Sequence, residues 1–184
     1  MYINVRSAFG DPEIRQIMSL RDDVISRFSP LFRNPARLTR DDYLEFLTIR
    51  NTNHWSDVER RDHEAADDMD HLRTAIALLV DHSAPLPARI DTVRDMLPTV
   101  SVDTLTPILL VAYPDHYGIW SETSEAALKD LGHWPDFESG ATTGEKYQKI
   151  NETLLRLADE HRVDLWTLAA LWLLERRPKA PTPG

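Results

Sequence analysis

The chain contains no cysteine. This absence excludes disulfide bonds, thiolate metal sites and a cysteine nucleophile. Also missing are a Walker loop, a dinucleotide-binding glycine fingerprint, an HExxH motif and a zinc-finger spacing, so no cofactor is expected. The N-terminal stretch MYINVRSAFGDPE lacks the order of basic, apolar and small residues typical of a secretory signal, and no apolar run is long enough to span a bilayer. We therefore expect a cytoplasmic protein.

Alternation of apolar and polar residues is missing too, so strands should be few or absent. Apolar residues recur at helical spacing instead, and 184 residues are enough for one domain with a proper core. We predict an all-α protein, a single orthogonal bundle of about eight or nine helices in residues 1–177 with a disordered tail at 178–184. Helices are expected at 12–28, 39–51, 63–81, 88–97, 104–113, 121–131, 142–158 and 164–177, with a short helix or turn near 56–59 and an irregular basic linker between Pro30 and Pro35.

Positive charge is scarce, since the formal net charge is −9. This weighs against a broad nucleic-acid surface, because phosphate contacts need clustered lysine and arginine. One basic strip between residues 26 and 40 has no acidic residue among its arginines, which are Arg27, Arg33, Arg37 and Arg40. It is either a solvated connection between helices or a contact surface for nucleic acid.

Residues 97–132, LPTVSVDTLTPILLVAYPDHYGIWSETSEAALKDLG, read as a buried helix, a turn and a second helix. Ser101 or Asp103 can cap the first helix, with Pro107 tolerated in its first turn. Ser121 can cap the second helix, and Gly132 fits a left-handed end. Side chains that can cap a helix also occur at other expected helix starts. These are Thr39 with Asp42, Ser56 with Glu59, Thr142 with Glu145, and Asp164.

This order of Leu-Pro hairpin, buried helix, loop and capped helix resembles the helix-hairpin-helix DNA glycosylase superfamily. Residues 43–60, YLEFLTIRNTNHWSDVER, are similar to an early part of the same family. The resemblance implies the family's fold but not its chemistry. The hairpin glycines are matched by Thr99 and Ser101, the nucleophilic lysine by Asp103, and the catalytic aspartate by Ser121. Segments around Asn53 and from 114 to 120 are also similar to helical domains of bacterial restriction or defence proteins.

Two groups of residues border the cleft that the resemblance implies. The first is a polar corner of Asn51, Asn53, His54 and Trp55, which either borders a base pocket or satisfies buried backbone groups and fills the core. The second surrounds the following loop and comprises Asp115, His116, Tyr117, Trp120 and Ser121. A Ser-His-Asp triad in this second group has no G-x-S-x-G signature to support it. Tyr117 and Trp120 are expected to pin the loop against the core, and Trp166 and Trp172 to lie in the core or at an interface.

His63, Asp67 and His71 are spaced to lie on one face of the predicted helix 63–81. One straight helix rarely supplies three ligands to one ion, because its outer pair lies about 12 Å apart. The alternatives are two of them with a partner such as Asp41 or His54, or an ordinary acidic solvated face.

Three functions remain open. The first is a non-catalytic, glycosylase-like domain that binds DNA or accompanies a DNA-processing or defence partner, with contacts from Arg33, Arg37, Asn53, His54, Trp55, Arg60 and His116. The second is an acidic protein-interaction or scaffold module without nucleic-acid binding. The third is a metal-assisted hydrolase that uses the face of His63, Asp67 and His71. The residues at the glycosylase catalytic positions, Asp103 and Ser121, argue against an enzyme.

Overall fold

The computed structural model describes residues 10–48 and 60–175, and the structural statements below concern these residues. They form nine α-helices and two short 3-10 helices and contain no strand, which confirms the all-α class and the expected helix number. In chain order the elements are α2 (Pro12–Arg33), η1 (Pro35–Arg37), α3 (Arg40–Thr48), α4 (Arg60–Glu64), η3 (Ala65–Asp67), α5 (Met69–Val80), α6 (Leu86–Met96), α7 (Val102–Ala112), α8 (Glu122–Asp130), α9 (Thr143–His161) and α10 (Leu165–Glu175).

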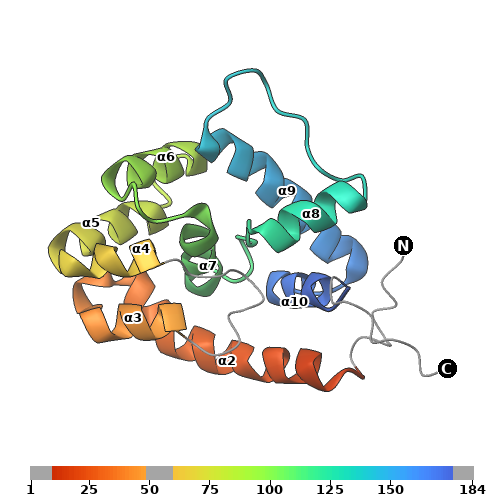
Figure 1. The fold of residues 1–184 in the computed structure, drawn as a ribbon, viewed down its shortest axis with the longest axis horizontal. Coiled ribbons are helices and arrows are strands. Elements are labelled where there is room, and N and C mark those ends of the chain that lie inside the picture. The colour runs from red at the N-terminus through yellow and green to blue at the C-terminus, as the bar shows by residue number, and fades with distance from the viewer. Residues whose placement is uncertain (1–9, 49–59, 176–184) are drawn as a thin grey trace.

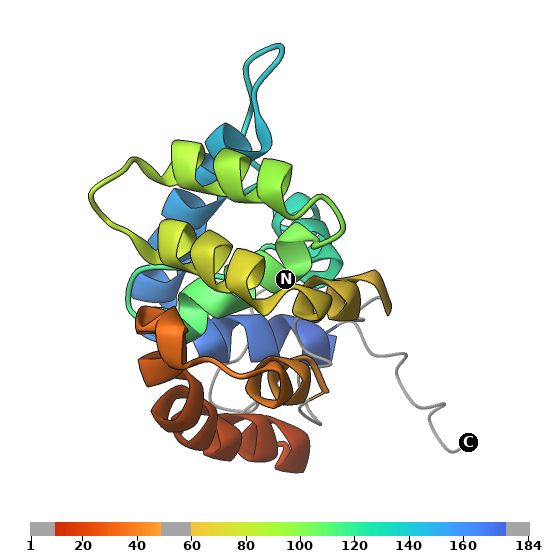
Figure 2. The same cartoon turned by 90° about the vertical axis from the view of Figure 1, so that its left-hand side faces the viewer.

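Helix α7 lies at the centre of the bundle (Figure 1). Every residue from Thr104 to Ala112 is buried, because the helix meets protein on all sides. Helix α2 packs along α7, α6 packs on both α5 and α9, and α10 contacts α2, α8 and α9. In the turned view α2 lies at one end of the molecule and α6 near the other (Figure 2). One hydrophobic cluster extends from Ile14 to Trp172 and holds these helices together.

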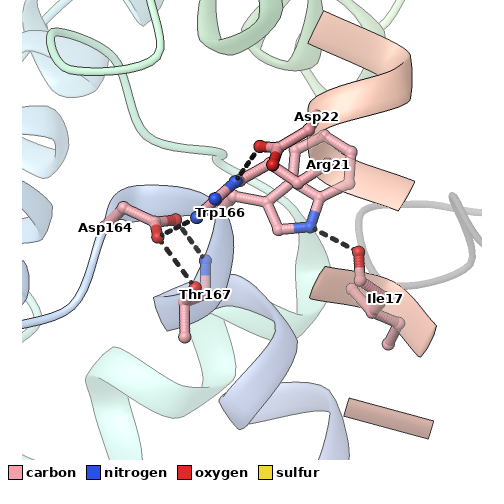
Figure 3. A network of polar contacts seen from close by, with 6 residues as sticks. All are labelled: Ile17, Arg21, Asp22, Asp164, Trp166 and Thr167. Carbon is pink, nitrogen blue, oxygen red and sulfur yellow. Dashed lines mark hydrogen bonds and ion pairs between the residues drawn. The ribbon is translucent and has the colours of Figure 1, made fainter. Parts of the chain in front are cut away.

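The first and last described helices are joined by a polar network (Figure 3). Asp164 accepts hydrogen bonds from the amide and hydroxyl of Thr167, at 2.8 and 3.0 Å, and so caps α10 as predicted. The same carboxylate pairs with Arg21 of α2 at 2.7 Å. Trp166 is 2% exposed and donates its indole N–H to the Ile17 carbonyl at 3.1 Å. A local helix start is therefore also a tertiary contact between α2 and α10.

The predicted helix starts at Thr39, Ser121 and Thr142 are confirmed. The hydroxyl of Thr39 accepts the Asp42 amide at 3.1 Å, that of Ser121 accepts the Ser124 amide, and that of Thr142 accepts the Glu145 amide. Helix α8 ends at a left-handed Gly132 with φ +72°, also as predicted. The predicted start at Ser56 lies outside the described residues.

The predicted linker between Pro30 and Pro35 is wrong. Helix α2 continues through Pro30 to Arg33, and Pro35 begins the 3-10 helix η1. Pro30 removes one hydrogen bond, but apolar packing on both sides of it keeps the last turn helical. Phe28 and Phe32 pack on the ring of Phe46, with ring centroids 5.4 and 4.7 Å away.

Helix α7 starts two residues earlier than predicted, so Pro107 falls in its second turn rather than its first. Ser101 is the N-cap residue, but its side chain makes no capping hydrogen bond. Its backbone amide instead donates to the carboxylate of Asp62, which comes from α4 and is 1% exposed, at 3.1 Å. A distant carboxylate thus stabilises the start of the central helix, where the helix dipole favours negative charge.

The predicted core position of Trp166 and Trp172 is confirmed, since they are 2% and 1% exposed. Among the helices that the structure describes, none combines the length and the apolar character needed to cross a bilayer.

Candidate functional site

The structure separates the predicted cleft residues into two places, one at each end of α7. Arg33, His116 and Tyr117 gather at its C-terminal end, around Tyr113. Trp120 and Ser121 lie at its N-terminal end. The 11 residues of α7, at about 1.5 Å rise each, set these ends about 16 Å apart.

Several other predicted contact residues cannot be assigned to either place. Residues 49–59 lie outside the described part of the chain, and with them Asn51, Asn53, His54 and Trp55. Arg60 begins α4, but its side chain also lies outside what the structure describes.

At the C-terminal end of α7, the ring of Tyr113 lies beside three basic side chains, those of Arg33, His82 and His116. The guanidinium carbon of Arg33 lies 5.2 Å from the centroid of the Tyr113 ring, within cation–π range. The ring centroids of His82 and His116 lie 4.3 and 6.2 Å from that of Tyr113, and 6.1 Å from one another. The side chains of Arg33, His82 and His116 are exposed. Together with the buried pair described next they form what we call the α7 C-terminal cluster, comprising Arg33, His82, Arg89, Tyr113, His116 and Tyr117.

Two buried side chains, Arg89 and Tyr117, support this cluster from beneath. Arg89 of α6 is 6% exposed and donates to the Leu79 carbonyl at 2.8 Å and to the Tyr117 hydroxyl at 2.9 Å. That hydroxyl also lies 3.1 Å from Nε2 of His82. Because a guanidinium can only donate, the Tyr117 hydroxyl accepts from Arg89 and has its own proton to donate to His82. This arrangement favours neutral His82 with an unprotonated Nε2.

The surroundings of His82 also disfavour its charged form. Although His82 is largely exposed, its partial burial lowers its pKa below 6.5, and repulsion by Arg89, His116 and Arg33 lowers it further, against the opposite effect of Asp81. Asp81 is engaged with Ser83, whose amide and hydroxyl donate to it at 2.9 and 2.8 Å. His82 is therefore an acceptor at neutral pH.

The basic strip divides into paired and unpaired arginines. Arg27 pairs with Glu45, and Arg40 lies 3.3 Å from Asp67. Within the described part of the chain, no ion pair is formed by Arg33 or Arg37. The arginines of the strip that form no ion pair within the described residues are thus Arg33, which belongs to the α7 C-terminal cluster, and Arg37, which lies in η1 just after α2.

The N-terminal end of α7 borders an open hollow of about 450 Å³. It is lined by both residues that match the glycosylase catalytic positions, Asp103 and Ser121, together with Val102, Trp120, Glu122, Glu125, Ala126 and Lys129. We call it the acidic hollow, because three of these residues are carboxylates and Lys129 is already paired with Glu125 at 2.5 Å. The two positions that the resemblance matches to the family's catalytic residues thus line one hollow, which is rich in carboxylates.

Ser121 has a structural part in this hollow. It is 3% exposed, and its hydroxyl accepts the Ser124 amide while its own amide donates to the Ser124 hydroxyl at 2.8 Å. The pair closes the first turn of α8 as a capping box. Trp120 is held by hydrogen bonds from its amide to Thr106 at 3.0 Å and from its indole to Glu125 at 3.2 Å. The expected pinning of the loop is therefore confirmed for this residue.

The single helical face expected for His63, Asp67 and His71 is wrong. His63 belongs to α4, Asp67 to η3 and His71 to α5. The break arises at Asp68, whose side chain accepts the His71 amide at 3.0 Å and starts a new helix. The His71 ring lies 2.9 Å from the Met96 carbonyl. In the described ranges, no three histidine, aspartate or glutamate side chains are grouped so that they could hold one metal ion.

Three members of the α7 C-terminal cluster were not singled out from the sequence, namely His82, Arg89 and Tyr113. Arg89 had a usable signal, because it lies at helical spacing from Leu86 and Val93 in an otherwise apolar stripe. A charged residue on a buried face is informative, since it requires buried partners. His82 and Tyr113 carry no such signal.

No family model matches the chain, and neither does a curated protein or a solved structure. The resemblance to DNA glycosylases therefore stays a prediction.

Proposed function

We propose that the protein is a non-catalytic helical domain that binds DNA, on a fold like that of the helix-hairpin-helix glycosylases. The observation that carries this proposal is the position of two arginines of the basic strip, Arg33 in the α7 C-terminal cluster and Arg37 in η1 just after α2. Arg33 and Arg37 form no ion pair within the described residues, although the chain as a whole carries a net charge of −9. Arginines of this kind can contact backbone phosphates, and Tyr113 adds an aromatic surface beside them.

The non-catalytic part of the proposal is supported by the acidic hollow. At the position of the family's nucleophilic lysine stands Asp103, which has no amine to attack a sugar carbon. At the position of the catalytic aspartate stands Ser121, whose buried hydroxyl is used in the capping box of α8. A hydroxyl used in this way supplies neither the base nor the electrostatic stabilisation expected of the family's aspartate.

Fluorescence anisotropy with labelled duplex and single-stranded DNA at low and moderate salt tests this proposal. The double variant Arg33→Ala/Arg37→Ala should weaken binding and reduce the dependence of log K on log salt by about 0.9 for each duplex phosphate that it no longer binds. The matched control is Arg27→Ala/Arg40→Ala, which removes the same formal charge from arginines that are already paired. We expect this control to bind almost as the unchanged protein does. If both double variants lost the same DNA affinity, the loss would reflect net charge alone and not a site at Arg33 and Arg37. If the unchanged protein bound no DNA at low salt, the proposal would be refuted.

A second candidate function, a module that binds a basic protein segment, is favoured by the acidic hollow. Its carboxylates Asp103, Glu122 and Glu125 lie on one open surface that a lysine-rich or arginine-rich segment could contact. Titration with a labelled oligolysine peptide would distinguish this function, because Glu122→Gln should weaken peptide binding and leave DNA binding unchanged. If Glu122→Gln bound the peptide as tightly as the unchanged protein, the acidic hollow would not be the peptide-binding surface.

A further inference from the structure

The α7 C-terminal cluster contains two arginines and no carboxylate among its six members. Arg89 is 6% exposed, yet its guanidinium donates to a neutral carbonyl and a neutral hydroxyl. Its Nε has no hydrogen-bond partner within the described residues. A buried guanidinium that forms no ion pair is costly, because its charge has lost water and the carboxylate of Asp81 acts on it only from a distance.

Two acidic residues lie near the cluster. Asp81 is turned to Ser83, whose amide and hydroxyl it binds. Asp115 is exposed on the loop beside His116. Within the described residues, neither aspartate forms an ion pair with Arg33 or Arg89.

The sign of this charge decides which ligand the cluster can take. Two histidine rings 6.1 Å apart could suggest a metal site, but Arg33 and Arg89 would repel a cation there. An anion gains from both arginines and from each histidine that becomes protonated beside it. The oxygen atoms of a phosphate group point in several directions, so they can accept hydrogen bonds from side chains that approach from different helices and loops.

We propose that the α7 C-terminal cluster binds one phosphate group between Arg33, His82 and His116, and that a proton is taken up by the histidine pair on binding. The proposal deepens the proposed function, on which it rests, by naming the group of the nucleic acid that this site would hold. Arg33 approaches from the end of α2, His82 from the segment after α5, and His116 from the loop after α7. Tyr113 provides the surface between them.

Proton uptake follows from the groups that face His82. These are Asp81, which precedes His82 in the chain, Arg33 from α2, Arg89 from α6, Tyr113 at the end of α7, and His116 and Tyr117 from the loop after α7. Without a ligand, burial and the positive groups keep the pKa of His82 low and the ring neutral. A bound phosphate adds negative charge at close range and so raises that pKa. If one proton is taken up, affinity should increase by up to about tenfold for each unit of falling pH.

Histidine ring signals in NMR spectra, followed during titration with inorganic phosphate and with sulfate, test the inference. Sulfate is included because its charge stays constant between pH 7.5 and about 6, whereas phosphate itself titrates near this range. Both anions should shift the ring signals of His82 and His116 and leave those of His161 unaffected, and sulfate should bind more tightly at the lower pH. Arg33→Ala should weaken binding about tenfold or more, and Arg27→Ala should leave it unchanged.

Several outcomes separate this inference from the proposed function. DNA binding without any anion response at His82 and His116 would overturn the phosphate site and leave the DNA-binding proposal intact. An anion response without DNA binding would support the site and overturn the proposed function, pointing to a free phosphorylated small molecule as the source of the phosphate. Sulfate affinity that is the same at both pH values would refute proton uptake, and equal effects of the Arg33 and Arg27 variants would refute the site.

Discussion

Substituting Gly144 by alanine should destabilise the protein, although alanine is normally the better helical residue. Gly144 lies in the first turn of α9, where that helix crosses α6. A Cβ atom at this position would lie 2.1 Å from the carbonyl oxygen of Pro87 and 2.6 Å from its Cα. The obstacle is backbone rather than a flexible side chain, so α6 and α9 would have to separate.

The expected magnitude comes from two opposing effects. The helical preference of alanine over glycine contributes at most about 1 kcal/mol of stability. Overpacking of a close-packed contact costs about 1–3 kcal/mol, here toward the upper end, and the hydrogen bond from the Gly144 amide to Asp91, 2.8 Å long, would be strained as well. We therefore expect Gly144→Ala to lower the free energy of unfolding by about 2–3 kcal/mol, which corresponds to a fall in Tm of roughly 5–10 °C for a chain of this size.

Urea denaturation and thermal melting of Gly144→Ala measure this change. Gly132→Ala is the matched control, because a Cβ there meets no atom within 4 Å and the only penalty is its φ of +72°. That penalty should be about 1 kcal/mol. A Gly144→Ala variant as stable as the unchanged protein, or more so, would refute the close contact between α6 and α9.

Two further predictions concern a helix cap and a histidine. Asp164→Ala should cost about 1–2 kcal/mol in urea denaturation, because it removes the cap on Thr167 and the pair with Arg21, whereas Asp22→Ala should cost less than about 0.5 kcal/mol. Similar losses in the two variants would contradict the capping role. His82 has a lowered pKa, so the unfolded chain binds its proton more readily and the folded protein loses stability as pH falls below about 6.5. His82→Gln should remove this loss, and urea midpoints at pH 7.5 and about 5.5 that fall equally in both proteins would refute it.

The sequence was sufficient for the helix starts because these depend on neighbouring residues. Thr39, Ser121, Thr142 and Asp164 each accept an amide three residues ahead, and that spacing can be read directly from the chain. The all-α class followed in the same way from apolar residues at helical spacing.

The errors in the fold arose where packing or a competing side chain overrode local preference. Pro30 is a helix breaker by itself, but the rings of Phe28, Phe32 and Phe46 keep α2 helical through it. Conversely, helical spacing predicted one helix from 63 to 81, whereas the side chain of Asp68 begins a second one. The spacing of apolar residues along the chain could not predict either result, because it contains no information on tertiary packing or on side chains that compete for backbone amides.

The candidate site was less predictable than the fold. Arg33, His116 and Tyr117 were selected from the sequence as cleft residues, yet Trp120 and Ser121 from the same predicted cleft lie at the opposite end of α7. His82 and Arg89 entered only through the packing of α5 and α6 around the α7 C-terminus.

The sequence by itself determined what depends on neighbours along the chain, namely the helical class, the capped starts and the excess of acidic charge. The tertiary structure alone decided which charges remain unpaired, because pairing depends on distances between residues far apart in sequence. Arg27 and Arg33 look alike in the basic strip, but only Arg27 faces a carboxylate once α2 and α3 are packed, while Arg33 is turned to Tyr113. That difference, created by folding, leaves the Arg33 guanidinium beside an aromatic ring and without an ion pair among the described residues.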